Sequence, residues 1–187
     1  MTDKPTYPGN SRLGEIEIIE EIQVFKNQYA TLFNDKVRFP SGTTGQYLRF
    51  CWNAPYGVMV IPFDNEGRLL LIRTFRHETR SWQWQIPKGF GERSLTPEQC
   101  AHKELFEETG QRVTEMTLLH TLNENGNATY VYRALIEPRK AASSEEHEAS
   151  EAIAETALFT PEQCRELLSD DRLDDPITLY AALLACR

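Results

Sequence analysis

Cysteine, basic charge and long hydrophobic runs are all scarce in this sequence, and each shortage excludes a class of protein. The four cysteines, Cys51, Cys100, Cys164 and Cys186, lie far apart without a CxxC pair, and none of the four histidines clusters with them. Such spacing excludes the usual zinc site and a disulfide framework. We therefore expect reduced thiols, most of them packed inside the protein.

Basic residues are outnumbered by acidic ones, 20 to 28, which gives a formal net charge of −8. A sequence-independent grip on long DNA or RNA needs a basic face, so the composition excludes that function, whereas a short phosphorylated substrate needs only a few arginines. No apolar run approaches the roughly 18–20 residues of a membrane span, and the start, MTDKPTYPGN, lacks the apolar segment of a secretion signal. We therefore expect a cytoplasmic protein with neither a membrane nor a long nucleic acid as partner.

The chain has 187 residues, enough for one well-buried core with an appended lobe. Residues 1–13 are poor in apolar side chains and predict a flexible tail. At 14–55, alternating residues and a PSGTTG turn predict an N-terminal antiparallel β lobe, and the main domain is expected at 56–187. The strands of the lobe are expected at 15–25, 29–39 and 46–52.

The main domain mixes strands with helices, which indicates the α/β class. Strands are expected at 56–63, 68–76, 112–123, 128–136 and 153–159, and helices at 97–109, 161–168 and 175–186. The segment TPEQC introduces the first two helices, at 96–100 and 160–164. Each copy offers a Thr N-cap, a Pro at the first helical position and a Gln that can close a capping box, so shared capping chemistry explains the repeat.

Three glutamates crowd into KELFEETG, residues 103–110, at the end of the first predicted helix. Glu104, Glu107 and Glu108 occupy adjoining positions on one side of that helix, and Gly110 is suited to end it in the left-handed conformation. Like charges at this spacing destabilise a helix by roughly 0.2–0.5 kcal/mol per pair. The chain therefore either leaves these carboxylates to water or gives them a cation, and the two hypotheses imply different functions.

The segment before the helix, WQIPKGFGERS at 84–94, favours the cation. Gly89 and Gly91 flank Phe90 in an expected loop, where glycine allows the backbone to approach a ligand and the Lys88 carbonyl would be aimed toward the helix. Carbonyl and carboxylate oxygens on an open surface suit Mg²⁺ or Mn²⁺, which keep several waters and are completed by substrate phosphates. The pattern thus predicts a divalent-cation site.

The same region resembles the Nudix box, GX5EX7REUXEEXGU, in which U is a bulky aliphatic residue. The matching positions are Gly89, Glu104, Leu105, Glu107, Glu108 and Gly110. With GVMVIPFDNEGRLLLIRTFRHETRSWQWQIPKG upstream and DPITLYAALLA downstream, the chain is similar to the ADP-ribose pyrophosphatase branch of that family over residues 15–187. The resemblance implies a Nudix α/β/α sandwich with a mixed sheet, preceded by the small N-terminal antiparallel β lobe.

This copy of the box departs from the motif at three positions. Leu95 stands where the motif has its first Glu, Lys103 where it has Arg, and Gln111 where it has an aliphatic residue. Lys103 keeps the positive charge and can pair with Glu107, without the bidentate fork of Arg. Leu95 can accept neither a proton nor a hydrogen bond, so any auxiliary basic role at that position is lost, while the metal-binding glutamates are retained.

The resemblance implies a hydrolase in which water attacks the diphosphate linkage of a nucleoside diphosphate derivative with the help of Mg²⁺, or of Mn²⁺ instead. The metal ligands that it implies are Glu104, Glu107, Glu108 and the carbonyl of Lys88. The catalytic residues that it implies are Glu107, Glu108 and Glu151. Glu151, in the segment EASEAIAET, is the candidate general base, and Glu148 is the next choice.

Substrate contacts are implied for Arg73, Arg76 and Lys88. On an alternating strand Arg73 and Arg76 face opposite sides, so at most one of them points into a cleft unless a bulge intervenes, and Arg76 is the preferred candidate. A surface ion pair is the alternative for either arginine. The family branch also implies a homodimer that forms through the N-terminal lobe.

The resemblance leaves the substrate open. ADP-ribose or a nucleotide sugar is the first expectation, because the similarity covers nearly the whole chain. The Ser-Pro-Gly turn common in that branch is absent, with NENGN at 123–127, and IPKG in place of Leu-Pro-Ala-Gly resembles the dinucleoside polyphosphate and diphosphoinositol branches. A dinucleoside polyphosphate is therefore the alternative substrate. A Nudix-fold ligand-binding or regulatory protein with weakened catalysis, suggested by Leu95, Lys103 and Gln111, is the alternative function.

Overall fold

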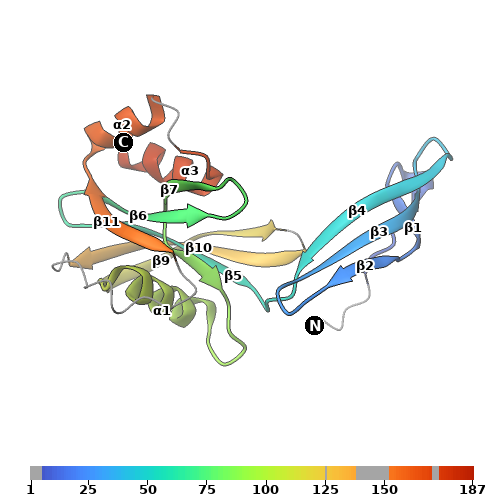
Figure 1. The fold of residues 1–187 in the computed structure, drawn as a ribbon, viewed down its shortest axis with the longest axis horizontal. Helices are drawn as coiled ribbons and strands as arrows, with labels where there is room; N and C mark the ends of the chain where they lie inside the picture. Colours follow the sequence, from blue (N-terminus) through green and yellow to red (C-terminus); the bar gives the residue numbers. More distant parts are fainter. Residues whose placement is uncertain (1–5, 125, 138–151, 170–172) are drawn as a thin grey trace. The chain divides into compact units, whose positions relative to one another are not determined.

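The computed structural model describes residues 6–124, 126–137, 152–169 and 173–187, and contacts within the chain divide it into two units (Figure 1). The N-terminal unit runs to Tyr56 and includes Asn123–Ala128, and the main unit comprises Gly57–Leu122 and Thr129–Arg187. Each unit is built on a sheet of its own. In the part of the chain that the structure describes, no helix combines the length and apolar character needed to span a membrane.

The N-terminal unit is an antiparallel sheet, preceded by the short 3-10 helix η1 (Ser11–Leu13). Its strands are β1 (Glu17–Glu20), β2 (Gln23–Lys26), β3 (Ala30–Arg38) and β4 (Thr44–Trp52). β3 lies in the centre, paired with β4 along its whole length on one edge and with β1 and β2 on the other. The antiparallel lobe expected from the alternating residues is therefore present.

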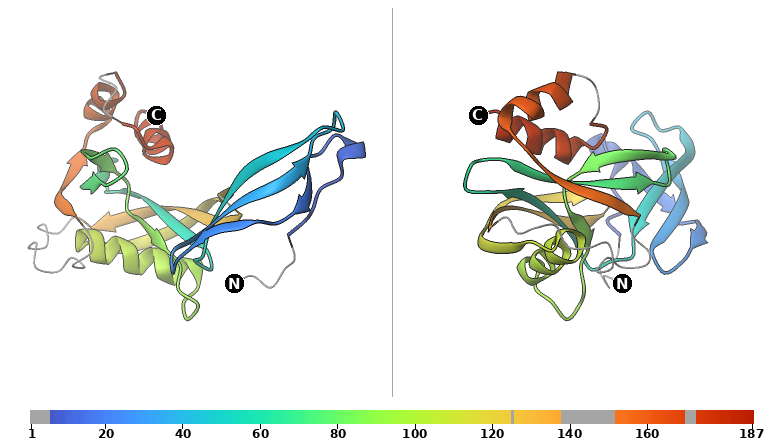
Figure 2. Two further views of the ribbon diagram at one scale, coloured as in Figure 1. Left: turned by 45° about the vertical axis from the view of Figure 1, so that its right-hand side comes forward. Right: turned by 60° about the vertical axis from the view of Figure 1, so that its left-hand side comes forward.

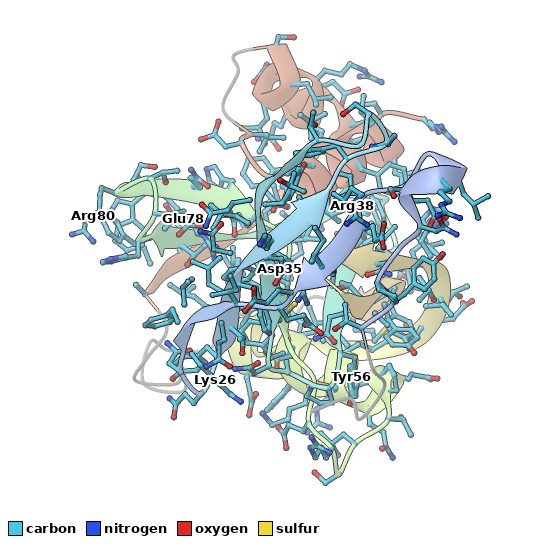
Figure 3. The ribbon with its side chains drawn as sticks, turned by 90° about the vertical axis from the view of Figure 1, so that its right-hand side faces the viewer. Lys26, Asp35, Arg38, Tyr56, Glu78 and Arg80 are labelled. Carbon is cyan, nitrogen blue, oxygen red and sulfur yellow. The ribbon has the colours of Figure 1, made fainter. Side chains whose placement is uncertain are left out.

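The stretch 15–25, expected as one strand, forms two strands because a side chain from β3 interrupts the ladder. Asp35, labelled in Figure 3, is 2% exposed and accepts the Ile22 N–H at 3.3 Å and the Arg49 Nε–H at 2.7 Å. Arg49 also pairs with Glu21 at 2.6 Å, just before the interruption. Since a side chain rather than a neighbouring strand binds the Ile22 amide, the strand ends there and a new one starts at β2.

The main unit contains the other strands, except the last residues of β9 and the first of β10, and all three α-helices of the described chain. Its strands are β5 (Gly57–Phe63), β6 (Leu69–Arg76), β7 (Ser81–Gln85), β8 (Lys88–Phe90), β9 (Arg112–Glu124), β10 (Asn127–Glu137) and β11 (Ile153–Phe159). Its helices are α1 (Pro97–Thr109), α2 (Pro161–Ser169) and α3 (Pro176–Ala185). The sheet order is β11-β6-β5-β10-β9, with β7 on β6 and β8 on β5. β5 and β10 run parallel while β6 pairs antiparallel with β5, β7 and β11, so the sheet is mixed.

Helices cover both faces of this sheet, with α1 on one face and α2 and α3 on the other (Figures 1 and 2). Leu69 and Leu71 of β6 pack in one buried cluster with Leu167 of α2 and Ala181 of α3. Leu70, also buried, points to the opposite face because side chains alternate along a strand. The α/β/α sandwich predicted from the sequence is thereby confirmed.

Both copies of TPEQC begin a helix, as predicted. Thr96 Oγ1 accepts the Gln99 N–H at 3.2 Å, while the Gln99 side chain accepts the Thr96 N–H at 3.0 Å. Thr160 and Gln163 repeat this reciprocal pair at 3.3 and 2.9 Å. Each box satisfies two amides that have no partner within the helix. At the other end of α1, Gly110 adopts the predicted left-handed conformation with φ of 68°.

Strand β8 corrects the expectation of a loop at Gly89–Gly91, and strand β7 was not expected from the sequence. Gly89 lies within β8, opposite Val58 of β5. β5 and β6 pair with each other only at Phe63 and Leu69, so the rest of each strand has an open edge. β7 pairs with that edge of β6, and β8 pairs with that edge of β5. The alternation in Ser-Trp-Gln-Trp-Gln is the signal from which β7 could have been predicted.

Candidate metal and substrate site

Helix α1 carries the three glutamates in its C-terminal half, and the fold separates them. Glu104 and Glu108 are 9% and 5% exposed, one turn apart on the side that packs against the sheet. Glu107 lies at the rim, with 30% of its side chain exposed. Burial of an ionised carboxylate is unfavourable unless hydrogen bonds or a positive charge compensate for it. The two inner glutamates therefore need partners, and strand β8 supplies the first of them.

Gly89 of β8 lies directly against the Glu104 carboxylate. A Cβ added at Gly89 would lie 2.2 Å from both Glu104 Cδ and Glu104 Oε2, a separation that real Cβ atoms do not show. Gly89 is not among the glycines with positive φ, so the close approach, rather than backbone conformation, requires the absence of a side chain. The first glycine of the motif thus makes room for a carboxylate.

The backbone of β8 turns one edge toward α1. The Val60 N–H binds the Pro87 carbonyl at 2.9 Å, so the next antiparallel pair, Met59 with Lys88, is of the non-hydrogen-bonded kind. The N–H and C=O of Lys88 therefore both point away from β5. In agreement, the Lys88 N–H donates to Glu108 Oε2 at 3.1 Å. The Lys88 carbonyl consequently shares the strand edge on which Glu108 lies.

Phe90 lies two residues after Lys88 in β8, so its N–H and C=O also point away from β5. Its carbonyl accepts the Cys100 thiol of α1 at 3.5 Å, and the Cys100 sulfur lies 4.0 Å from Glu104 Oε1. Burial raises the pKa of the Cys100 thiol, and the negative charge of Glu104 raises it further, so the group remains a neutral thiol. The strand edge and the helix are thus joined on both sides of Gly89.

Lys103 supplies positive charge at the rim. Its Nζ lies 2.7 Å from Glu107 Oε2 and 3.2 Å from Glu92 Oε1, which confirms the predicted pairing with Glu107. The hydrogen bond to Glu107 raises the pKa of Lys103 despite partial desolvation, so the ammonium stays charged. A single Nζ binds both carboxylates here, where the arginine of the motif would offer a planar fork.

The oxygen atoms at this edge fit a divalent cation of the Mg²⁺ class. The Glu104 and Glu108 carboxylates and the Lys88 carbonyl are hard donors, and the missing side chain at Gly89 lets one carboxylate lie against the strand. Within the described ranges, no three Asp, Glu, His or Cys side chains form a ready-made metal-binding group, and Glu107 is engaged with Lys103. A cation held here would complete its shell with water and phosphate oxygens, as Mg²⁺ commonly does.

The Lys88 side chain leaves this edge for the opposite face of the sheet. Its Nζ lies 2.7 Å from Asp175 Oδ1, and the two side chains are 22% and 14% exposed. Asp175 is the N-cap of α3 and accepts the Thr178 N–H at 2.9 Å. Burial alone would raise the pKa of Asp175, but the Lys88 charge and the hydrogen bonds from Lys88 and Thr178 outweigh it and hold the pKa below its usual value. The ammonium proposed for substrate contact is thus paired with Asp175.

Arg73 and Arg76 lie on opposite faces of β6, because the register with β7 is unbroken. Arg73 pairs with Glu155 of β11 at 2.9 Å, on the face of α2 and α3. Arg76 binds Glu78 at 2.7 and 3.0 Å and lies on the same face of β6 as Leu70. Glu78 belongs to the turn between β6 and β7 and is labelled in Figure 3. Arg76 therefore lies on the face of β6 opposite Arg73, and its preference as a substrate contact stays a prediction.

Two site residues proposed from the sequence, Glu151 and Glu148, lie outside the described residues. One relevant contact was missed, the ion pair between Lys88 and Asp175. The capping signal identified Asp175 as the start of a helix, but no local pattern connects it to a lysine so far away in the sequence.

Comparisons with known proteins give consistent results. A family model described as NUDIX domain matches residues 54–180. The chain is 26% identical over 171 residues to an ADP-ribose pyrophosphatase of Bacillus subtilis (strain 168), covering 89% of this chain and 90% of that protein. It is 27% identical over 176 residues to a methanol dehydrogenase activator of Bacillus methanolicus, covering 91% and 92%. The fold matches a crystal structure of an ADP compounds hydrolase with a TM-score of 0.73 and 22% identity, covering 91% of each chain.

Proposed function

This chain belongs to the Nudix family, and we propose that it is a Mg²⁺-dependent pyrophosphohydrolase that cleaves the diphosphate linkage of a nucleoside diphosphate derivative. One observation carries the proposal: two carboxylates, Glu104 and Glu108, are buried against the outward edge of β8, where Gly89 leaves space and Lys88 presents its backbone. A solvated acidic helix face would leave these side chains exposed. Their burial favours the cation hypothesis over the solvated one.

The chain's own residues have separable roles in this proposal. Glu104, Glu108 and the Lys88 carbonyl would hold Mg²⁺, and Glu107 would hold it at the rim or through a water. When bound, Mg²⁺ supplies Lewis acidity, activates water and neutralises phosphate charge. Lys103 keeps Glu107 in place through their 2.7 Å contact until the cation and the substrate compete for that carboxylate.

ADP-ribose or a nucleotide sugar is the proposed substrate, supported by similarity to proteins named ADP-ribose pyrophosphatase and ADP compounds hydrolase. Arg76 is the proposed phosphate or ribose contact because it lies on the α1 face, and Arg73 is the second candidate. The side chains of Arg76 and Glu78 are 35% and 61% exposed. Since an exposed ion pair contributes at most about 1 kcal/mol, a phosphate can replace Glu78 as the partner of Arg76 at low cost.

Glu151 is the proposed general base, with Glu148 as the alternative. Both are glutamates of the acidic segment between β10 and β11 in the sequence, and a carboxylate is a group that can act as a general base. The substitutions Glu151→Gln and Glu148→Gln distinguish them: the base is the residue whose loss lowers kcat at saturating Mg²⁺ while substrate KM stays unchanged.

A homodimer through the N-terminal unit is proposed from the apolar face of its sheet. Phe25, Leu48 and Phe50 are 53%, 64% and 37% exposed, and pairing through Leu32 of β3 places them on one face. A second copy would cover this patch. Light scattering should show a dimer that Leu48→Lys dissociates, while Tyr47→Lys, on the other face of β4, leaves it intact. A monomeric wild type would refute this part of the proposal.

The test of the proposed activity is phosphate release, with alkaline phosphatase added, from ADP-ribose, nucleotide sugars, NADH and diadenosine polyphosphates in Mg²⁺ or Mn²⁺. Glu108→Gln retains an acceptor for the Lys88 N–H but loses the charge, so we expect its activity to fall by at least about a hundredfold. Glu98→Gln, an exposed glutamate in the first turn of the same helix, is the matched control. Preference for a diadenosine polyphosphate would move the substrate to the alternative class.

A regulatory protein is the second candidate function, favoured by the similarity to a methanol dehydrogenase activator. The same panel distinguishes it. A protein that binds ADP-ribose in calorimetry and hydrolyses none of the compounds would act by binding. The double variant Leu95→Glu, Lys103→Arg would then test whether the altered positions of the box account for the absence of hydrolysis.

A further inference from the structure

The first turn of α3 holds the short segment that leads into Gly89. Lys88 Nζ contacts Asp175 Oδ1 at 2.7 Å, and the Ile86 N–H donates to Thr178 Oγ1 at 3.0 Å. Thr178 is 0% exposed, so its hydroxyl forms its hydrogen bonds with protein groups and not with solvent. The two ends of the tripeptide Ile86–Lys88 are therefore bonded to Thr178 and Asp175, at the start of α3.

Asp175 governs both of these contacts. Its Oδ2 accepts the Thr178 N–H at 2.9 Å and the Thr178 hydroxyl at 2.6 Å. Because that hydroxyl donates its one proton to Asp175, its lone pairs are left to accept the Ile86 N–H. One carboxylate thus holds the tripeptide directly at Lys88 and through a hydroxyl at Ile86.

Two further backbone groups of this segment are fixed from other directions. Pro87 has no N–H, and its carbonyl accepts the Val60 N–H at 2.9 Å. The Lys88 N–H donates to Glu108 at 3.1 Å. The Ile86 N–H and both polar groups of the Pro87–Lys88 peptide are thus held, and the pairing of Lys88 with Met59 directs the Lys88 carbonyl away from β5.

We infer that Asp175 is a positioning residue for the metal-binding edge of β8, acting through Lys88 and Thr178 to aim the Lys88 carbonyl toward α1. The inference rests on the proposed function, in which a divalent cation binds at that edge. Asp175 lies with α3 on the face of the sheet opposite Glu104, so it acts through the strand and not on the cation itself. Residues that orient metal ligands typically change metal affinity or activity by about 10–100-fold when substituted.

The test is Mn²⁺ titration of the full chain, followed by electron paramagnetic resonance, for wild type, Asp175→Asn, Lys88→Met and the double variant. Asn is as good an N-cap as Asp, so Asp175→Asn keeps α3 but loses the charge opposite Lys88. Lys88→Met keeps the backbone carbonyl. We expect each single variant to bind Mn²⁺ about tenfold more weakly. The double variant should be no weaker than the weaker single one, because both substitutions remove one interaction.

Two further variants separate positioning from stability. Thr160→Ala removes the N-cap of α2, which takes no part in the contacts that Asp175 and Thr178 make with Ile86 and Lys88, and should lower the melting temperature without changing Mn²⁺ affinity. Lys88→Arg keeps the charge and should retain most of the affinity. For whichever substrate is turned over, Asp175→Asn should lower kcat at limiting Mn²⁺, recover it at high Mn²⁺, and leave substrate KM unchanged.

Wild-type Mn²⁺ affinity in Asp175→Asn and Lys88→Met would overturn the inference, as would a wild type that binds no Mn²⁺. A raised substrate KM in Lys88→Met, with Mn²⁺ affinity intact, would overturn it in favour of a lysine that binds phosphate directly. A wild type that binds Mn²⁺ in an Asp175-dependent way but hydrolyses nothing refutes the proposed activity and leaves the inference standing.

Discussion

Gly89 and Glu104 are fitted so closely that a single methyl group on Gly89 would overlap the Glu104 carboxylate, 2.2 Å from its Cδ. One residue belongs to β8 and the other to α1, so the contact determines how closely the strand and the helix approach at the site. The same edge of β8 bonds to Glu108 through Lys88 and to Cys100 through Phe90. The motif glycine therefore has a steric role that can be measured.

Gly89→Ala should displace the Glu104 carboxylate or push β8 away from α1. Overpacking of this kind costs about 1–3 kcal/mol of unfolding free energy, and the Mn²⁺ affinity should fall by at least about tenfold because a ligand moves. Gly45→Ala in β4 is the control, since the three atoms nearest its Cβ would belong to the ring of Phe39, the first at 2.8 Å. Unchanged Mn²⁺ binding in Gly89→Ala would show that Glu104 is not a ligand.

Lys103→Met should strengthen metal binding while impairing turnover. Its ammonium lies 2.7 Å from Glu107 and competes with a cation for that carboxylate, so its removal leaves one more negative charge at the site. Because the two side chains are 35% and 30% exposed, solvent and salt screen the charge, and an ion pair of this kind contributes at most about 1 kcal/mol, so we expect roughly a two- to fivefold gain in affinity. Lys103→Arg should leave Mn²⁺ affinity near that of wild type. Weaker binding by Lys103→Met would mean that Lys103 orients Glu107 as a ligand instead.

Arg49→Met should destabilise the N-terminal unit. Asp35 is 2% exposed and would lose the 2.7 Å contact from Arg49, whose own side chain is 27% exposed. Breaking a buried pair at one end costs about 3–5 kcal/mol, and the partial exposure of Arg49 reduces the expected loss to about 2–3 kcal/mol. Urea unfolding measures it. Arg38→Met, which removes an ion pair with an exposed arginine, should cost less than about 1 kcal/mol.

Cys164 should make the folded state less stable at alkaline pH. Burial, the larger cause, and the neighbouring Cys186 raise the pKa of Cys164 from 9.0 to about 11. The folded chain therefore binds the thiol proton more tightly than the unfolded chain, so this contribution is fully present below pH 9 and is lost between pH 9 and pH 11. Urea unfolding of wild type and Cys164→Ala should show a free-energy difference that shrinks over this window. A constant difference would contradict the prediction.

Local signals located most helices and strands correctly, because the forces behind them act over a few residues. The Thr-Pro-Glu-Gln boxes, Gly110 and the apolar alternation need only near neighbours, and α1 begins and ends where the sequence places it. The interruption at Ile22 and strands β7 and β8 were missed. β7 carries a local alternation that was overlooked, whereas the other two depend on partners distant in the sequence, Asp35 for the interruption and β5 for β8.

For the site, the sequence by itself determined which carboxylates come together on one helix. Spacing alone puts Glu104, Glu107 and Glu108 on one side of a helix, with a glycine ahead of it. Tertiary structure decided which carboxylates are buried, which edge of β8 faces them, and that Lys88 is held by Asp175. Those features depend on how a strand, a helix and the start of a second helix pack together, and no periodicity within a single element encodes such a distance.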